Sequence, residues 1–283
     1  MTIFNKSASP TPNEIEEASR KEARAVAFPP DRLLCRVLGM FKMFAPSSDV
    51  SLTPHLAMDG YWESWITAAF CRLVWPDMHV VNVGANIGYY SLLAAHLVGK
   101  HGRVDAFEPN PALVGVLRDN ASVNGFREIL RVDPRAVADK PGEMLLRYPR
   151  NNPMMGSVLK RNVEWVESAA FVDFWDVASV GVTTLDDAVD HRPDLVFVDA
   201  EGAEPLVIAG MLGHIGKSPL GPTLVLEWSP RRYDDPKGAA KAITSLGYKV
   251  CEIREDGTGR SLGADEFAAI EEETTVVCRR DAR

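Results

Sequence analysis

The feature that most constrains the fold is a regular alternation of short apolar runs with helical patterns from residue 79 onward. The apolar runs are rich in β-branched residues and occur at His79–Gly84, Arg103–Glu108, Ile129–Asp133, Asp194–Ala200, Thr223–Ser229, Tyr248–Ile253 and Thr274–Arg280. Strands that alternate with helices form βαβ units, which build a mostly parallel sheet. The sequence therefore predicts an α/β fold. Asn110-Pro111 and Asp235-Pro236 each offer an N-cap followed by proline at the first helical position.

One segment interrupts this alternation. Residues Pro141–Thr184 contain the runs EMLLRYP, NNPMMGSVLKRN and FVDFWDV, none of which has helical spacing. We expect a β-rich insertion between the third and fourth strands that leans over the ligand site.

The N-terminal part of the chain has a different composition. Residues 1–30 are polar and rich in Ser, Pro and Glu, which predicts disorder. Asp31–Phe44 and Gly60–Val74 have apolar residues at helical spacing. We therefore expect a helical cap over residues 31–76, packed on a main domain that spans residues 77–283.

Charge and cysteine content limit the partners of the chain. The net charge is −8 without any Lys/Arg run, which disfavours nucleic acid as a partner. No apolar run is long enough to cross a membrane, and the N-terminus lacks the apolar core of a signal peptide. We expect a cytoplasmic protein without a membrane partner, and the sequence leaves open whether it is a monomer or a homodimer.

The four cysteines are far apart in the sequence, which favours free thiols over a zinc site or disulfides. They are Cys35, Cys71, Cys251 and Cys278.

The run Val81–Gly88 (VNVGANIG) lies between a predicted strand and helix, where ligands of α/β sheets bind. The dinucleotide pattern GxGxxG, begun at Gly84, would need glycines at the positions that Asn86 and Tyr89 occupy. This mismatch disfavours NAD, although an NAD-dependent oxidoreductase or epimerase stays the alternative enzyme. The pattern suits a ligand without phosphate, such as S-adenosylmethionine. Its predicted cofactor-binding residues are Gly84, Ala85, Asn86 and Gly88.

Glu108 ends the second predicted strand and is followed by Pro109 and Asn110. A carboxylate at this position accepts hydrogen bonds from both ribose hydroxyls of an adenosine ligand. We assign these three residues, together with Ala136 after the third strand, to the cofactor site. These residues support a cofactor that contains adenosine, but they do not distinguish S-adenosylmethionine from other adenosine cofactors.

A second group of polar residues follows the apolar strand at residues 195–198. Asp199, Glu201 and Glu204 place three carboxylates within six residues at the carboxyl edge of the sheet. Asp199 and Glu201 are expected to reach the crevice, and Asp199 to contact the cofactor as well. Glu204 begins the next helix, where the helix N-terminus alone would favour a negative charge.

With these residues in place, the chain resembles the FkbM-type family of class I S-adenosylmethionine-dependent methyltransferases. The resemblance covers Gly60 to Arg280 and depends on VNVGANIGYYSLLAA, AFEPNP, the N-x-x-x-N of Asn120 and Asn124, VTTLDD and VDAEGAEPLVIAG. One position departs from the family pattern: Phe197 stands where the family often has a lysine.

The resemblance implies a Rossmann-like sheet of seven strands in the order 3-2-1-4-5-7-6, with the last strand antiparallel. It also implies methyl transfer from S-adenosylmethionine, commonly to hydroxyls of sugars, polyketides or other secondary metabolites. A protein that binds the cofactor without turnover is the non-enzymatic alternative. The predicted substrate-binding residues are Glu63, His55, Asn152, Ser157, Glu204 and Glu227.

Methyl transfer to an aliphatic hydroxyl needs a group that removes the hydroxyl proton. Asp199 is the first candidate for this base and Glu201 the second, with His55 and His191 as alternatives. A divalent metal held by carboxylates of residues 199–204 is the competing device. We predict a carboxylate base and no metal.

Overall fold

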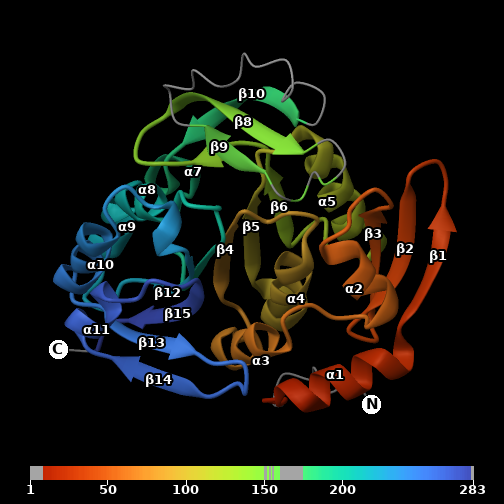
Figure 1. The fold of residues 1–283 in the computed structure, drawn as a ribbon, viewed down its shortest axis with the longest axis horizontal. Helices are drawn as coiled ribbons and strands as arrows, with labels where there is room; N and C mark the ends of the chain where they lie inside the picture. The colour runs from red at the N-terminus through yellow and green to blue at the C-terminus, as the bar shows by residue number, and fades with distance from the viewer. Residues whose placement is uncertain (1–8, 150–151, 153, 155, 160–174, 282–283) are drawn as a thin grey trace.

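The computed structural model describes residues 9–149, 152, 154, 156–159 and 175–281. Its centre is an eight-stranded sheet of order β14-β13-β15-β12-β11-β4-β5-β6 (Figure 1). The strands are β4 (His79–Val83), β5 (Arg103–Phe107), β6 (Leu130–Asp133), β11 (Leu195–Val198), β12 (Thr223–Trp228), β13 (Lys249–Ile253), β14 (Gly259–Leu262) and β15 (Thr274–Arg279).

Strands β6, β5, β4, β11 and β12 are parallel, and β15 lies antiparallel between β12 and β13. The expected order 3-2-1-4-5-7-6 and the antiparallel last strand are therefore confirmed. The sheet has one strand more than expected, because β14 pairs with β13 as a hairpin at the edge.

Helices cover both faces of this sheet, and the alternation of strand side chains gives each face its own apolar core. Phe197 and Val225 pack in the cluster on the side of α3, α4 and α5. Val198 and Leu226 pack in the cluster on the side of α8, α9 and α10. The helices and 3-10 turns are α3 (Ser64–Leu73), α4 (Tyr89–Val98), η1 (Gly99–His101), α5 (Pro111–Val123), α7 (Leu185–Ala188), α8 (Glu204–Ala209), α9 (Leu212–Gly216), η2 (Pro230–Arg232), α10 (Pro236–Ser245) and α11 (Ala264–Ala268).

The insertion between the third and fourth central strands forms a second sheet of order β7-β10-β8-β9. It is β-rich, as expected, and lies above the carboxyl ends of β4 and β5 (Figure 1). Its strands are β7 (Ala136–Val137), β8 (Gly142–Pro149), β9 (Ser157–Leu159) and β10 (Trp175–Thr183). Parts of the predicted segment, at residues 150–151, 153, 155 and 160–174, lie outside the described residues.

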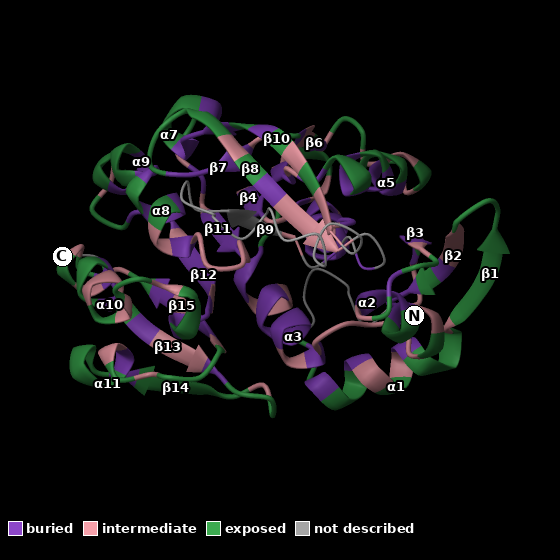
Figure 2. Ribbon diagram, turned by 45° about the horizontal axis from the view of Figure 1, so that its top comes forward, coloured by how far each residue is buried: buried purple, intermediate pink, exposed green. Residues whose placement is uncertain are grey.

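The N-terminal segment differs from the expectation of disorder followed by helix. From residue 9 the chain is ordered as α1 (Pro12–Glu22), β1 (Arg24–Phe28), β2 (Arg32–Val37), β3 (Phe41–Pro46) and α2 (Leu52–Met58). Residues 1–8 lie outside the described residues. The second expected helix, Gly60–Val74, is present as α3. Strand β1 is exposed along its whole length (Figure 2).

The helix expected at Asp31–Phe44 is wrong, because this segment forms β2 and the start of β3. In β3, Phe41, Met43 and Ala45 are buried while Lys42 is exposed, which is the period of two of a strand. The same apolar residues also fit a helical spacing, so periodicity alone did not decide between the two.

Contacts with α5 decide in favour of the strand. Asn120 accepts a hydrogen bond from Phe44 N at 2.7 Å and donates to Phe44 O at 3.0 Å. Asn124 accepts from Lys42 N at 3.0 Å and donates to Lys42 O at 2.7 Å. The two amide side chains therefore bond to β3 as a neighbouring strand would. This is the structural role of the N-x-x-x-N pattern.

None of the described helices has the length and apolar character needed to span a membrane.

Candidate active site

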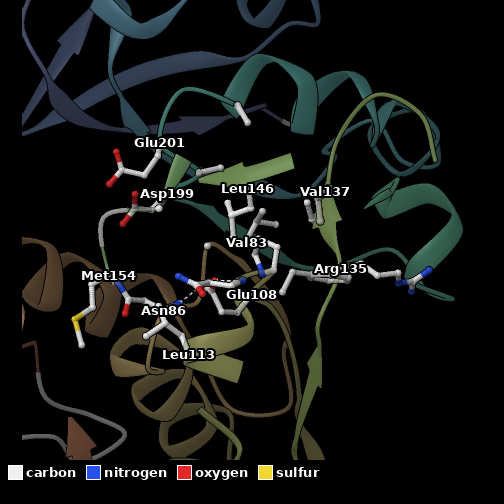
Figure 3. Close-up of a pocket in the computed structure, with 18 residues that line it drawn as sticks. Val83, Asn86, Glu108, Leu113, Arg135, Val137, Leu146, Met154, Asp199 and Glu201 are labelled. Carbon is white, nitrogen blue, oxygen red and sulfur yellow. Dashed lines mark hydrogen bonds between the residues drawn. The ribbon is translucent and has the colours of Figure 1, made fainter. Parts of the chain in front are cut away.

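A cavity of about 670 Å³ opens at the carboxyl ends of β4, β5 and β11, below β8 (Figure 3). This edge is where open α/β sheets bind ligands. Eight of the residues predicted from the sequence line it: Gly84, Asn86, Glu108, Pro109, Asn110, Ala136, Asp199 and Glu201.

The turn after β4 depends on a glycine at position 84. Gly84 has φ +77°, and a Cβ added there would lie 1.7 Å from the carbonyl oxygen of Asp199. Gly84 N and Ala85 N both donate to Phe107 O at 3.0 Å. The turn therefore holds the ends of β4, β5 and β11 together, and no side chain fits at position 84.

The next residues lead into α4. Asn86 is in the left-handed region with φ +53°, and its Oδ1 accepts from Ile87 N at 2.8 Å. Gly88 is the N-cap of α4 with φ +99°, and an added Cβ would lie 2.4 Å from Leu117 Cδ1. Gly88 and Ala85 shape the turn without lining the cavity, whereas Gly84 and Asn86 line it.

Glu108 is 6% exposed, and both of its carboxyl oxygens accept backbone hydrogen bonds. Asn86 N donates to Oε2 at 2.7 Å, and Asn110 N donates to Oε1 at 2.8 Å (Figure 3). Burial raises the pKa of Glu108 to about 7, against the opposing effect of the two N–H groups. Because each oxygen has a second lone pair, the carboxylate can still accept two hydroxyl donors from the cavity.

The three carboxylates of residues 199–204 have different surroundings. Asp199 lines the cavity. Glu201 also lines it, has φ +53° and forms an ion pair with Arg232. Glu204 is fully buried at the start of α8, where it accepts from Ala200 N at 2.8 Å and Gly202 N at 3.1 Å. Its hydrogen bonds thus stabilise its own turn, and it does not line the cavity.

Asp199 is hydrogen-bonded to Glu227 of β12. Burial raises the pKa of Asp199, and burial next to Asp199 raises the pKa of Glu227 to about 11. Glu63, at φ +38° just before α3, accepts a hydrogen bond from Tyr90 Oη at 2.9 Å. Burial, followed by the charge of Asp199, raises the pKa of Glu63 to about 7. Glu63 and Glu227 therefore adjoin Asp199 behind the cavity wall.

Phe197, in place of the family lysine, belongs to an aromatic group beside these carboxyls. Its ring lies 5.7 Å from that of Phe70 and 4.7 Å from that of Tyr90. Apolar contacts therefore support Tyr90, whose hydroxyl bonds to Glu63, at a position where a lysine would add charge.

Two further predicted substrate residues, His55 and Asn152, are not among the described residues that line the cavity. His55 is in α2 with its side chain 55% exposed, and its ring lies 5.1 Å from that of Trp62. Asn152 is buried, with Oδ1 3.4 Å from Ser51 Oγ. Ser157 begins β9, and its side chain is outside the described part of the chain.

His191, an alternative base, is exposed in the segment that leads into the amino end of β11. The cavity lies at the opposite, carboxyl end of that strand. The position of His191 therefore does not support a role as the base.

Several cavity residues were not identified from the sequence. The position of Arg135, two residues after the third strand, was a weak indication that it lies at the site. Its side chain donates two hydrogen bonds to Asp133, from Nε to Oδ1 at 2.9 Å and from Nη2 to Oδ2 at 2.7 Å. Leu146 and Met154 come from the insertion, which was expected to lean over the site, but no local motif indicates which of its side chains reach the cavity. The others are Val83, Phe107, Leu113, Val137, Gly156, Ala200 and Ala203.

Within the described residues, no group of three or more His, Cys, Asp or Glu side chains has the arrangement of a metal site.

Comparison with known proteins gave a match to a family model described as the methyltransferase FkbM domain, over residues 82–250. A protein-L-isoaspartate O-methyltransferase from Aeropyrum pernix is 42% identical over 57 residues, which are 20% of this chain and 22% of that protein. The chain thus matches about a fifth of this relative's length.

Solved structures with a similar fold include a methyltransferase FkbM from Methylobacillus flagellatus, with 14% identity and a TM-score of 0.46. That alignment covers 75% of this chain and 50% of the other. An O-methyltransferase from Bacillus cereus, in complex with SAH, has 11% identity and a TM-score of 0.44, covering 83% and 84% of the two chains.

Proposed function

Because the family model covers residues 82–250 of 283, more than half, the chain belongs to the methyltransferase FkbM domain family, and we propose that it methylates a hydroxyl group of a small molecule. Membership supports S-adenosylmethionine-dependent methyl transfer as its activity. We propose a sugar, a polyketide or another secondary metabolite as the acceptor.

The residues around the cavity fit this cofactor. Glu108 has lone pairs left for both ribose hydroxyls, and Gly84, which lines the cavity, lets the turn after β4 lie against the carbonyl of Asp199. Asn86 and Asp199 border the part of the cavity nearest this turn, where we place the amino acid moiety, and Pro109, Asn110 and Ala136 line the adenosyl side. When bound, S-adenosylmethionine supplies the methyl group, whose bond to sulfur breaks as the bond to the acceptor oxygen forms.

The observation that carries the choice of oxygen is the half-buried carboxyl of Asp199 at the cavity wall, whose pKa is raised by desolvation. An aliphatic hydroxyl must lose its proton to become a good nucleophile, whereas a neutral amine already has a free electron pair. A carboxylate with a raised pKa accepts a proton more readily than a solvated one. A base of this kind is useful chiefly for a hydroxyl acceptor.

In this mechanism an Asp199 carboxylate oxygen accepts the hydroxyl proton, which contributes about 10²–10⁴-fold to the rate. Leu146 and Met154, from the insertion, cover the cavity with apolar groups and limit access of water. Glu201 remains the second candidate for the base, and it forms an ion pair with Arg232.

The first experiment is a calorimetric titration with S-adenosylmethionine, S-adenosylhomocysteine and NAD. We expect binding of the first two and no binding of NAD. Binding of NAD without any response to the sulfur ligands would contradict the cofactor assignment.

The second experiment screens hydroxyl- and amine-bearing acceptors with ¹³C-methyl-labelled cofactor and identifies the labelled atom by NMR. We expect O-methyl products, and N-methyl products alone would contradict the proposal. Asp199→Asn should lower turnover by about 10²–10⁴-fold with little change in S-adenosylhomocysteine affinity. Glu201→Gln is the matched comparison, and a larger loss in that variant would make Glu201 the base. No transfer to any acceptor would favour a cofactor-binding protein without turnover.

A further inference from the structure

We propose that Glu227 is a positioning residue for methyl transfer: its carboxyl group retains a proton, donates it to Asp199, and so fixes the Asp199 carboxylate as the base. This inference rests on the proposed function, because it assigns Glu227 a role through Asp199. It differs from the substrate contact expected from the sequence.

The strand register places these two carboxyls side by side. In the parallel pair β11–β12, Val198 lies opposite Leu226. Both side chains enter the core on the side of α8, α9 and α10. The next residues, Asp199 and Glu227, therefore project to the other face of the sheet, which α3 covers. Their side chains are hydrogen-bonded to each other there.

A hydrogen bond between two carboxyl groups requires one proton, because two carboxylates have only acceptors. Like charges at such close distance also oppose a second ionisation. The Asp199–Glu227 pair therefore holds one proton and carries one negative charge at neutral pH, as one unit.

The charges around the pair favour Glu227 as the group that keeps this proton. Partial burial, followed by the negative charges of Asp199, Glu273 and Glu63, raises the pKa of Glu227 to about 11. Burial and the charge of Glu273 also raise the pKa of Asp199, but its hydrogen bond with Glu227 and the positive charge of Arg232 partly offset this effect.

The contacts of the surrounding groups agree with this assignment. Tyr90 Oη donates to Glu63 at 2.9 Å, and Ser229 Oγ donates to Glu273 at 2.8 Å. Arg232 forms ion pairs with Glu201 and Glu273. Tyr233 is the other titratable group affected by Glu227, and it stays protonated because its pKa is raised. Each other carboxyl near Glu227 thus has its own donor, which leaves Asp199 as the acceptor for the proton of Glu227.

This arrangement leaves one Asp199 oxygen for the acceptor. The oxygen bonded to Glu227 is occupied, and the other can accept the hydroxyl proton as the new carbon–oxygen bond forms. After transfer, Asp199 carries that proton and releases it to solvent, while the Glu227 proton stays in place throughout.

A direct test needs neither acceptor nor cofactor. Protein labelled with ¹³C-glutamate is examined by infrared spectroscopy at about pH 9, where Glu63 and Glu108 are ionised. We expect the carbonyl band of one protonated glutamate in the wild type and its loss in Glu227→Gln. Absence of the band, or its persistence in the variant, would overturn the proposal even if O-methylation is observed.

A kinetic test uses an acceptor from the screen. Glu227→Leu removes the donor at similar volume and should lower kcat by about 10–100-fold with little change in KM. Glu227→Gln restores an N–H donor and should recover most of this loss. Combining Glu227→Leu with Asp199→Asn should add little to the loss from Asp199→Asn alone, since both changes act on one unit.

Two kinetic results would refute the positioning role. Glu227→Leu with nearly normal turnover would show that Asp199 needs no support. Glu227→Gln as slow as Glu227→Leu would show that a donor is not what position 227 supplies. If the protonated glutamate is found but only N-methyl products form, the proposed function fails while the proton assignment holds.

Discussion

Two carboxyl groups that line the same cavity, Glu108 and Asp199, are held in different ways. Glu108 receives both of its hydrogen bonds from backbone N–H groups of the turns after β4 and β5. Asp199 has its carboxyl partner in a side chain of another strand, Glu227, and its charged neighbours come from other parts of the chain. One side of the cavity thus depends on the path of the backbone, and the other on side chains.

This difference matters for how the site can vary. Backbone donors cannot be replaced by a single substitution, so the side of the cavity around Glu108 is suited to a fixed ligand. Side-chain partners can be exchanged one at a time without refolding the turn. We therefore propose that the Glu108 side fixes the cofactor, and that Asp199, which also borders the amino acid moiety of the cofactor, faces the variable part of the reaction, the acceptor.

The largest effect should come from changing the backbone-determined side. Gly84→Ala places a Cβ against the carbonyl of Asp199 at a positive φ, so the ends of β4 and β11 must separate. We expect a loss of stability of about 3 kcal/mol or more and no measurable S-adenosylhomocysteine binding. Urea denaturation and calorimetry measure the two effects.

Gly115→Ala is the control, since an added Cβ meets nothing within 4 Å in the middle of α5. It should be neutral or stabilising by up to about 1 kcal/mol. Normal cofactor binding in Gly84→Ala would show that the turn is not the rigid element described above.

The same substitution on the two sides compares them directly. In Glu108→Gln one acceptor oxygen becomes an amide that faces a backbone N–H, so we expect about 10–100-fold weaker S-adenosylhomocysteine binding. In Glu227→Gln the amide can donate to Asp199, so cofactor affinity should stay near that of the wild type. Calorimetry at neutral pH measures both, and equal losses would remove the distinction between the sides.

The Glu108 side was predictable from the sequence because its contacts are local. Gly84, Asn86 and Glu108 belong to short motifs at strand ends, and the positions of those ends follow from the alternation of apolar runs. Asn86 N and Glu108 are 22 residues apart but lie on neighbouring parallel strands, which a βαβ unit places together.

The Asp199 side and the N-terminal strands were not predictable in the same way. Asp199 and Glu201 are adjacent in one motif, yet their partners Glu227 and Arg232 lie in a later part of the chain. The Asp31–Phe44 segment was expected to be helical because the contacts that fix β3 come from Asn120, 76 residues beyond Phe44. Local spacing contains no information on such distant partners.

A moderate effect is expected on the pH dependence of stability. The folded-state pKa of Glu63 and of Glu108 is about 7, against about 4.3 in an unfolded chain. The folded protein therefore keeps protons that the unfolded chain has lost, so this stabilisation is complete below about pH 4 and is lost as the pH rises through 7. The slope is at most about 1.4 kcal/mol per pH unit for each group.

Urea denaturation at several pH values between about 5 and 8 measures this slope. The free energy of unfolding should fall as the pH rises, and Glu63→Gln should fall less steeply. The pKa values of Asp105 and Asp133 are lowered, so the stabilisation that these two carboxylates contribute is lost only at more acidic pH. They do not change the slope between about pH 5 and 8. His214, whose pKa is lowered by burial, acts in the opposite direction in this pH range, so the comparison of the two slopes is the test. A slope in Glu63→Gln equal to that of the wild type would contradict the raised pKa of Glu63.

The smallest effect should come from Arg232→Gln. Its side chain is 41% exposed and that of Glu201 is 29% exposed, so the ion pair contributes only about 0.2–1 kcal/mol to stability. Cofactor affinity should not change, because Arg232 does not contact the Glu108 side.

The value of this variant lies in its pH–rate profile. Arg232 lowers the pKa of Asp199, so its removal should move the acidic limb of the profile to higher pH if Asp199 is the base. If Glu201 is the base instead, Arg232→Gln should move the acidic limb in the same direction. The substitution Glu201→Gln separates the two cases, because it removes the shift of the limb only if Glu201 is the titrating group. A limb that still shifts in the Glu201→Gln, Arg232→Gln double variant therefore assigns the base to Asp199, and a limb that no longer shifts assigns it to Glu201.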